Sequence, residues 1–79
     1  MSPAKQTASL AVEKRKHGRV MTVIRGLSPA DNDLPALLTR LKNTCGAGGT
    51  IAENVLEVQG AHLERVRSEL QKIGYRVRG

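Results

Sequence analysis

The 79-residue sequence contains no Phe and no Trp, a single Tyr and a single Cys. One cysteine excludes an internal disulfide and any metal site built from several cysteines. No early apolar run resembles a secretion signal, and none approaches the ~18 apolar residues that suggest a membrane span. We therefore expect a cytoplasmic protein with no membrane partner.

The scarcity of aromatic residues also limits how the protein recognises a partner. RRM domains and other single-strand binders stack bases on Phe, Tyr or Trp, whereas this chain has only Tyr75. An aromatic stacking platform is therefore not expected. If the partner is an RNA, we expect the protein to recognise its phosphates and its shape.

The net charge of +6 is concentrated at the two ends of the chain. Residues 20–74 carry six Lys or Arg and six Asp or Glu, which sum to zero. Residues 1–19 contribute five cations against one Glu, and Arg76 and Arg78 add two more. A neutral body with basic ends indicates a polyanionic partner, most often nucleic acid. A membrane surface is disfavoured because residues 1–19 lack an extended apolar face.

Four of these cations fall within one run of six residues, "KRKHGR". The run comprises Lys14, Arg15, Lys16, His17, Gly18 and Arg19. It lies between "SLAVEKRK", which fits a short edge strand, and "GRVMTVIRGL", a strand rich in Val, Ile and Thr. A glycine among polar residues suits a hairpin turn. The run is therefore predicted to span a β-hairpin tip, and the alternative is a solvated charge run without a fixed place.

The rest of the chain alternates helices and strands. Residues 28–46 predict a helix with Asp31, Asn32 and Asp33 as candidate N-caps, Pro35 in its first turn and Gly46 as its stop. Residues 48–60 predict a second hairpin that turns at Glu53-Asn54. Residues 61–74 predict a second amphipathic helix, on which Arg65 and Glu69 are spaced to interact. Residues 75–79 are predicted to form a last strand.

This order, β-β-α-β-β-α-β, predicts an α+β fold. We expect a two-layer sandwich, in which an antiparallel or mixed sheet of about five strands carries two helices on one face. Residues 1–8 are expected to be a disordered tail, and residues 9–79 a single domain.

No catalytic or metal-binding pattern stands out. Cys45 falls on the apolar stripe of the first helix, where a free cysteine is usually buried. His17 and His62 lack further ligands at metal spacing. The "GAGG" of residues 46–49 follows a helix and precedes a strand, the reverse of a phosphate-binding glycine loop. We expect no enzyme activity, no metal and no cofactor.

The segment "TVIRGLSPADNDLPALLTRLKNTCGAGGTIAENVLEVQGAHLERVRSELQKIGYRVR" resembles the eukaryotic translation initiation factor 1 family, also called the SUI domain family. It is most similar to the short bacterial, YciH-like members. The resemblance covers roughly residues 13–78. Its most distinctive parts are "LKNTCGAGGTI", "LEVQG" and "KIGYRVR".

The resemblance implies a non-catalytic initiation factor that binds the small ribosomal subunit near the decoding centre. In the family the basic loop of the first hairpin reaches ribosomal RNA, which here implies Lys14 to Arg19. The first helix also faces the subunit, so Arg40 and Lys42 are further rRNA-binding candidates. Initiator tRNA or mRNA would then lie nearby, and we expect the protein to be a monomer. The Glu53-Asn54 loop is shorter than its counterpart that approaches tRNA.

Two alternatives remain open from the sequence. A general RNA-binding protein or RNA chaperone would need the same charges but no dedicated role in initiation. A protein-binding module would use its sheet and would not depend on the charge of the loop. Within the family, the sequence does not decide between a true initiation factor and a stress-time modulator of initiation.

Overall fold

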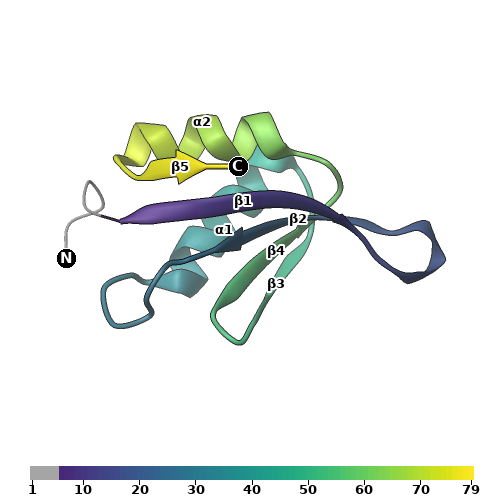
Figure 1. Ribbon diagram of the computed structural model, residues 1–79, viewed down its shortest axis with the longest axis horizontal. Helices are drawn as coiled ribbons and strands as arrows, with labels where there is room; N and C mark the ends of the chain where they lie inside the picture. Colours follow the sequence, from purple (N-terminus) through teal and green to yellow (C-terminus); the bar gives the residue numbers. More distant parts are fainter. Residues whose placement is uncertain (1–5) are drawn as a thin grey trace.

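A mixed five-stranded sheet with two helices packed on one face forms the fold (Figure 1). The computed structural model describes residues 6–79. The predicted α+β class and the order β-β-α-β-β-α-β are confirmed. The elements are β1 (Thr7–Lys14), a 3₁₀ turn (Lys16–Gly18), β2 (Val20–Arg25), α1 (Leu34–Cys45), β3 (Gly49–Ala52), β4 (Val55–Gln59), α2 (Leu63–Ile73) and β5 (Arg76–Arg78).

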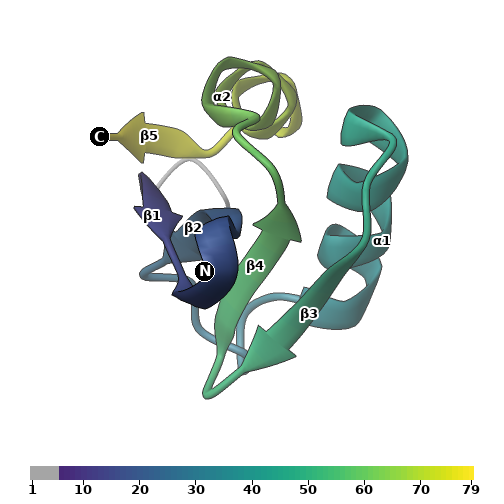
Figure 2. The same ribbon diagram turned by 90° about the vertical axis from the view of Figure 1, so that its right-hand side faces the viewer.

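The strands lie in the order β3-β4-β2-β1-β5, and β1 with β5 is the parallel pair (Figure 2). The expectation that the first strand is a short edge strand is wrong: β1 has eight residues and pairs on both sides. Its second partner comes from the far end of the chain, so the residues around β1 do not reveal it.

The expected boundary of the N-terminal tail also needs correction. Thr7 and Ala8 belong to β1, Ala8 is fully buried, and Gln6 is buried as well. The reason is the pairing with β5, which places Thr7 opposite Arg76 and Ala8 opposite Val77. Residues 1–5 of the expected tail lie outside the described residues.

Alternation along the strands separates two faces of the sheet. Leu10, Ile24 and Leu56 occupy paired positions and join the core beneath the helices. Residues an odd number of positions away, such as Glu13 opposite Met21, point to the other side. We call the side away from the helices the open face of the sheet.

Helix α1 begins and ends where the sequence predicts. Of the candidate caps, Asp33 accepts the backbone N–H of Ala36 at 3.1 Å. Gly46 ends the helix in the left-handed conformation, with φ of 63°. The apolar stripe is buried, including Cys45, so the expected core position of this cysteine is confirmed.

Helix α2 is held to α1 by an ion pair that local spacing does not predict. Val66 and Leu70 are completely buried against the core. Glu69, expected to interact with Arg65, instead accepts a hydrogen bond of 2.6 Å from the Nε of Arg40 on α1. Arg40 can reach Glu69 because the two helices pack side by side on the sheet.

The second hairpin turns through Glu53 and Asn54, as predicted. Their φ angles of 50° and 65° are both positive, which is the pattern of a type I′ turn. Such a turn matches the twist of the strands that it joins, so β3 and β4 are connected by the shortest common loop.

Two polar anchors hold the segments that cross the ends of the sheet. The Thr22 hydroxyl donates to the carbonyl of Gly60 at 2.7 Å and accepts the backbone N–H of His62 at 2.9 Å. The hydroxyl of the buried Tyr75 donates to the Asn32 side chain. Asn32 therefore fixes the loop before α1 rather than capping the helix.

Replacing Thr22 by Val should destabilise the fold by about 1–3 kcal/mol, because the Gly60 carbonyl and the His62 N–H lose their partner at a buried site. Urea denaturation followed by circular dichroism measures the change. Thr39→Val is the matched control, because the exposed Thr39 hydroxyl bonds only within its own helix. Equal unfolding midpoints for the two variants would contradict the anchoring role of Thr22.

Candidate nucleic-acid interface

The basic run forms the tip of the first hairpin and has a defined backbone. Arg15 and Arg19 face each other, and the N–H of Arg15 donates to the carbonyl of Arg19 at 2.6 Å. Between them, His17 and Gly18 both adopt positive φ angles, of 64° and 74°. This conformation is unusual for a residue with a side chain, although histidine is among those that tolerate it. The predicted hairpin is confirmed, and the charges sit on a structured turn.

One cation of the tip is already engaged by the protein itself. The guanidinium of Arg15 donates to Glu13 at 2.9 Å and to Glu57, on the neighbouring β4, at 3.1 Å. Glu13 also accepts from Arg25 at 2.9 Å. The pKa of Arg15 is raised, chiefly by its hydrogen bond to Glu57. Arg15 therefore ties the tip to the sheet and offers little free charge.

The side chains of the tip other than Arg15 are exposed. Within residues 6–79, no hydrogen bond or ion pair engages the side chains of Lys14, Lys16, His17 or Arg19. In Figure 1 the tip lies at one end of the long axis, which measures 38 Å. Three free cations thus project from the narrow end of the molecule.

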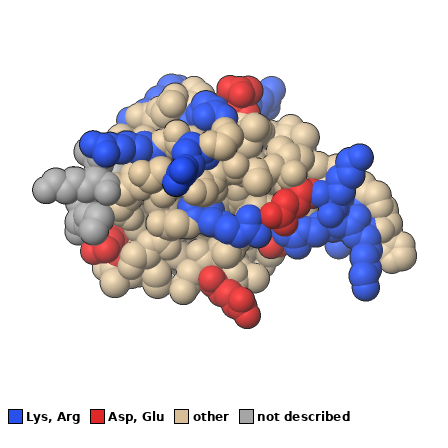
Figure 3. Space-filling model, viewed as in Figure 1, with Lys and Arg blue, Asp and Glu red and all other residues tan. Residues whose placement is uncertain are grey.

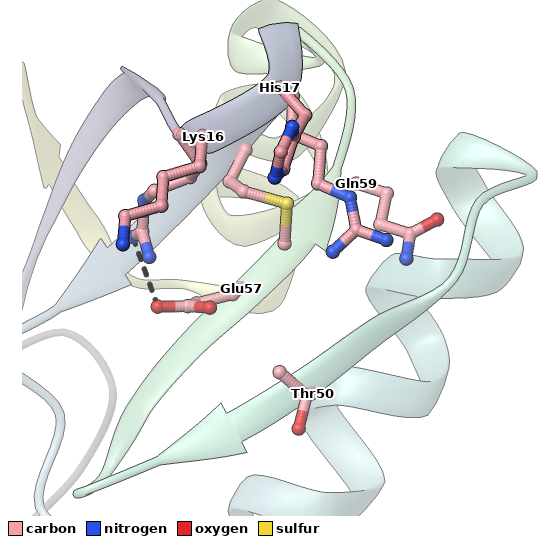
Figure 4. A pocket seen from close by; sticks show the side chains of 8 residues that line it. Lys16, His17, Thr50, Glu57 and Gln59 are labelled. Carbon is pink, nitrogen blue, oxygen red and sulfur yellow. Dashed lines mark hydrogen bonds and ion pairs between the residues drawn. The ribbon is translucent and has the colours of Figure 1, made fainter.

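An open pocket of about 390 Å³ lies between the tip and the open face. Figure 4 shows Lys16 and His17 reaching it from the hairpin, and Glu57, Gln59 and Thr50 from the strands opposite. Its lining residues are Arg15, Lys16, His17, Arg19, Met21, Thr50, Glu57 and Gln59. The pocket combines cations, neutral hydrogen-bonding groups and an apolar thioether.

The two candidates on α1 are not part of this site. Arg40 and Lys42 belong to the helix that packs on the opposite face of the sheet from the pocket. Arg40 is engaged by Glu69, and Lys42 is half-buried, its stem beside Gly49. Of the predicted rRNA-binding residues, those of the loop therefore lie together, and the two on α1 lie apart from them.

Sequence reasoning missed the residues that the strands contribute to the site. Met21, Thr50, Glu57 and Gln59 line the pocket, and the one local signal for them is that Glu57 and Gln59 alternate with apolar residues along β4. Arg25, Arg76 and Arg78 lie on the same open face. Figure 3 shows blue side chains extending from the hairpin across this face, with red ones between them.

Metal ligands, membrane-spanning helices and the single cysteine are the other features to consider within residues 6–79. No group of three potential metal ligands occurs there, and no helix there is long and apolar enough to span a membrane. Burial raises the pKa of the Cys45 thiol, which keeps it in the less reactive thiol form.

Comparison with known proteins points to one family. The family model described as "Translation initiation factor SUI1" matches residues 4–76. A "Protein translation factor SUI1 homolog" of Sulfurisphaera tokodaii is 40% identical over 75 residues, which is 95% of this chain and 75% of that protein. The homolog of Methanocaldococcus jannaschii is 40% identical over 70 residues, 89% of this chain and 68% of that protein. The homolog of Methanoregula boonei is 41% identical over 70 residues, 89% and 69% respectively.

The ion pairs around Glu13 predict an ordered set of titration shifts. Its pKa lies below the usual 4.5, chiefly because Arg25 donates a hydrogen bond, with Arg15 contributing less. Arg25→Gln should therefore raise the pKa of Glu13 more than Arg15→Gln does. Carbon NMR of the carboxyl group during a pH titration measures both, with Arg65→Gln on α2 as the control.

The sign of the accompanying stability change follows from the lowered pKa. The ion pairs stabilise the fold above pH 4.5, and this contribution is lost as the pH falls through the lower folded-state pKa. The salt-bridge assignment fails if Arg25→Gln leaves the midpoint of Glu13 where it was.

Proposed function

Since the chain belongs to the translation initiation factor SUI1 family, we propose that it binds the small ribosomal subunit through its basic hairpin tip. The family consists of translation initiation factors rather than enzymes, so the role is one of binding. The proposed contact lies near the decoding centre, where the bound protein influences the choice of start site and the placement of initiator tRNA.

The observation that carries the proposal is the set of free cations on the ordered tip. Lys14, Lys16 and Arg19 have no acidic partner within residues 6–79, while the backbone that carries them is fixed by the Arg15–Arg19 hydrogen bond and by the ion pair to Glu57. Cations that are already positioned meet phosphates without the entropy cost of ordering a flexible tail.

The position of the tip supports an effect through steric presence. The hairpin occupies one end of the 38 Å axis (Figure 1), so it reaches a confined site while the body of the domain stays outside it. Neutral charge over residues 20–74 favours a local contact over a general coat on RNA. A protein bound in this way excludes other molecules from the same space and needs no chemistry of its own.

Arg40 and Lys42 are proposed as a weaker, second contact. Arg40 keeps an exposed side chain although Glu69 neutralises much of its charge. Their layer of the molecule is separate from the tip, so both contacts together require a partner that wraps around the domain, as a large folded RNA does.

Removing two free cations from the tip should weaken binding to the small subunit and flatten its salt dependence. Lys16→Ala with Arg19→Ala should reduce the slope of log affinity against log salt by about 1.4–1.8, at about 0.7–0.9 for each phosphate contact. Co-sedimentation with purified small subunits across a salt series measures this. Arg15 stays native because its loss would leave Glu13 and Glu57 without their partner.

The matched control is Arg65→Ala with Lys72→Ala, which removes the same charge from exposed positions of α2. Equal loss in both double variants would mean that net charge, and not the tip, governs binding. A large excess of naked RNA that competes fully with the subunits at physiological salt would favour the general RNA-binding alternative.

A further inference from the structure

The pocket beneath the tip has a chemistry that phosphate binding does not require. We propose that it holds the base of one unpaired nucleotide of RNA, whose phosphate contacts Lys16 and Arg19 at the rim. The proposal rests on the proposed function, because it names a ligand at the same tip. It adds recognition of a base to a surface that otherwise contacts only phosphate and shape.

The size of the pocket and its apolar lining suit a flat ring. Its volume of about 390 Å³ lies in the range of about 300–1,000 Å³ that is typical of small-molecule pockets. Met21 offers a polarizable thioether, which makes favourable contacts with ring systems. A phosphate alone would gain nothing from this apolar surface.

Planar groups line the pocket although aromatic hydrocarbon rings are absent. Bases that leave a helix stack on histidine and on arginine guanidinium planes as well as on Phe, Tyr or Trp. His17 extends from the hairpin into the pocket (Figure 4), and Arg15 is fixed between Glu13 and Glu57. A guanidinium held by two carboxylates is already ordered before a ligand arrives.

The strands supply groups that match the edge of a base. The side chains of Gln59 and Thr50 have no hydrogen-bond partner within residues 6–79, and together they offer both donors and acceptors. The Glu57 carboxylate has acceptor sites beyond the one that Arg15 occupies. Base edges present donors next to acceptors, so a mixed set is required.

This mixed set favours a nucleotide over an acidic peptide. The carboxylate of Glu57 faces the pocket with only 16% of its side chain exposed, and it would repel a carboxylate placed beside it. A base avoids this repulsion because it is neutral, and its amino group can donate a hydrogen bond to the Glu57 carboxylate. The negative charge of a nucleotide remains on its phosphate, at the rim where Lys16 and Arg19 lie.

The test compares RNA with and without bases. A labelled single-stranded RNA hexamer and an abasic ribose-phosphate hexamer of the same length carry equal charge, and fluorescence anisotropy measures their affinities for the whole chain. We expect the intact hexamer to bind at least about threefold more tightly, the gain of roughly one net hydrogen bond. NMR should show that it shifts the Met21 methyl and the Gln59 amide signals, whereas the abasic hexamer shifts the tip alone.

Gln59→Met separates base recognition from charge, because it keeps the length of an exposed side chain and leaves the backbone bond to Gly48 intact. It should lower affinity for the intact hexamer by about three- to tenfold, with an unchanged salt slope and an unchanged affinity for the abasic hexamer. Gln71→Met, an equivalent change on the exposed side of α2, should change neither.

Three results would overturn the proposal. The first is equal affinity for the two hexamers. The second is binding of a free mononucleotide as tight as that of the hexamer, which would make the pocket a site for a small metabolite. The third is equally tight binding of a hexaglutamate peptide. If the intact and abasic hexamers bind equally, the base pocket is excluded. If Gln59→Met also binds small subunits normally, the proposed function still stands.

The reverse outcome is distinguishable from this one. If the small subunit binds without dependence on Lys16 and Arg19 while the hexamers still differ and Gln59→Met still loses affinity, the pocket stands and the proposed docking through the tip fails.

Discussion

The register of β1 against β2 is the constraint on which the rest of the structure depends. It places Leu10 opposite Ile24 beneath the helices and Glu13 opposite Met21 on the open face. Because side chains alternate, a slip of one residue would move every one of them to the wrong side of the sheet. The same register brings Lys14 opposite Val20 at the end of the ladder, so it also decides which residues remain for the tip.

The same register determines which charged side chains pair with one another. The open face carries Glu13 and Glu57 close to the tip, and both engage Arg15. One of the loop's cations is therefore used to secure the loop, and this frees the others from any structural task. The exposed pair Glu13–Arg15 contributes little to stability by itself. The pair Arg15–Glu57 fixes the direction of the turn, because Glu57 comes from a different hairpin.

Helix caps and turn residues made much of the fold predictable from the sequence. Asp33 before an apolar stripe, Gly46 after it and Glu53-Asn54 between two short strands each act within a few residues, and each was found where expected. The misses share a different cause. The beginning of β1 depends on β5, and the partner of Glu69 lies on another helix. Such pairings join residues far apart in the chain, and no local pattern records them.

The same difference between local patterns and distant pairings applies to the candidate site. The tip was predictable because the cations of residues 14–19 are contiguous, whereas the pocket needs Thr50 from β3 and Gln59 from β4. The low aromatic content argues against a stacking platform of Phe or Trp, but it gives no sign that Arg15, His17 and Met21 line one pocket.

Phosphate contacts at the tip together with one base contact would make a small interface selective. Phosphate contacts supply affinity that does not depend on sequence and weakens with salt. A single base held at the tip would add preference for an RNA with an unpaired nucleotide at the right place, and it would do so without enlarging the contact. Such a contact can remain reversible, because the body of the domain adds no net charge to it. Weak phosphate contacts and a weak base contact would together allow the domain to dissociate from such an RNA.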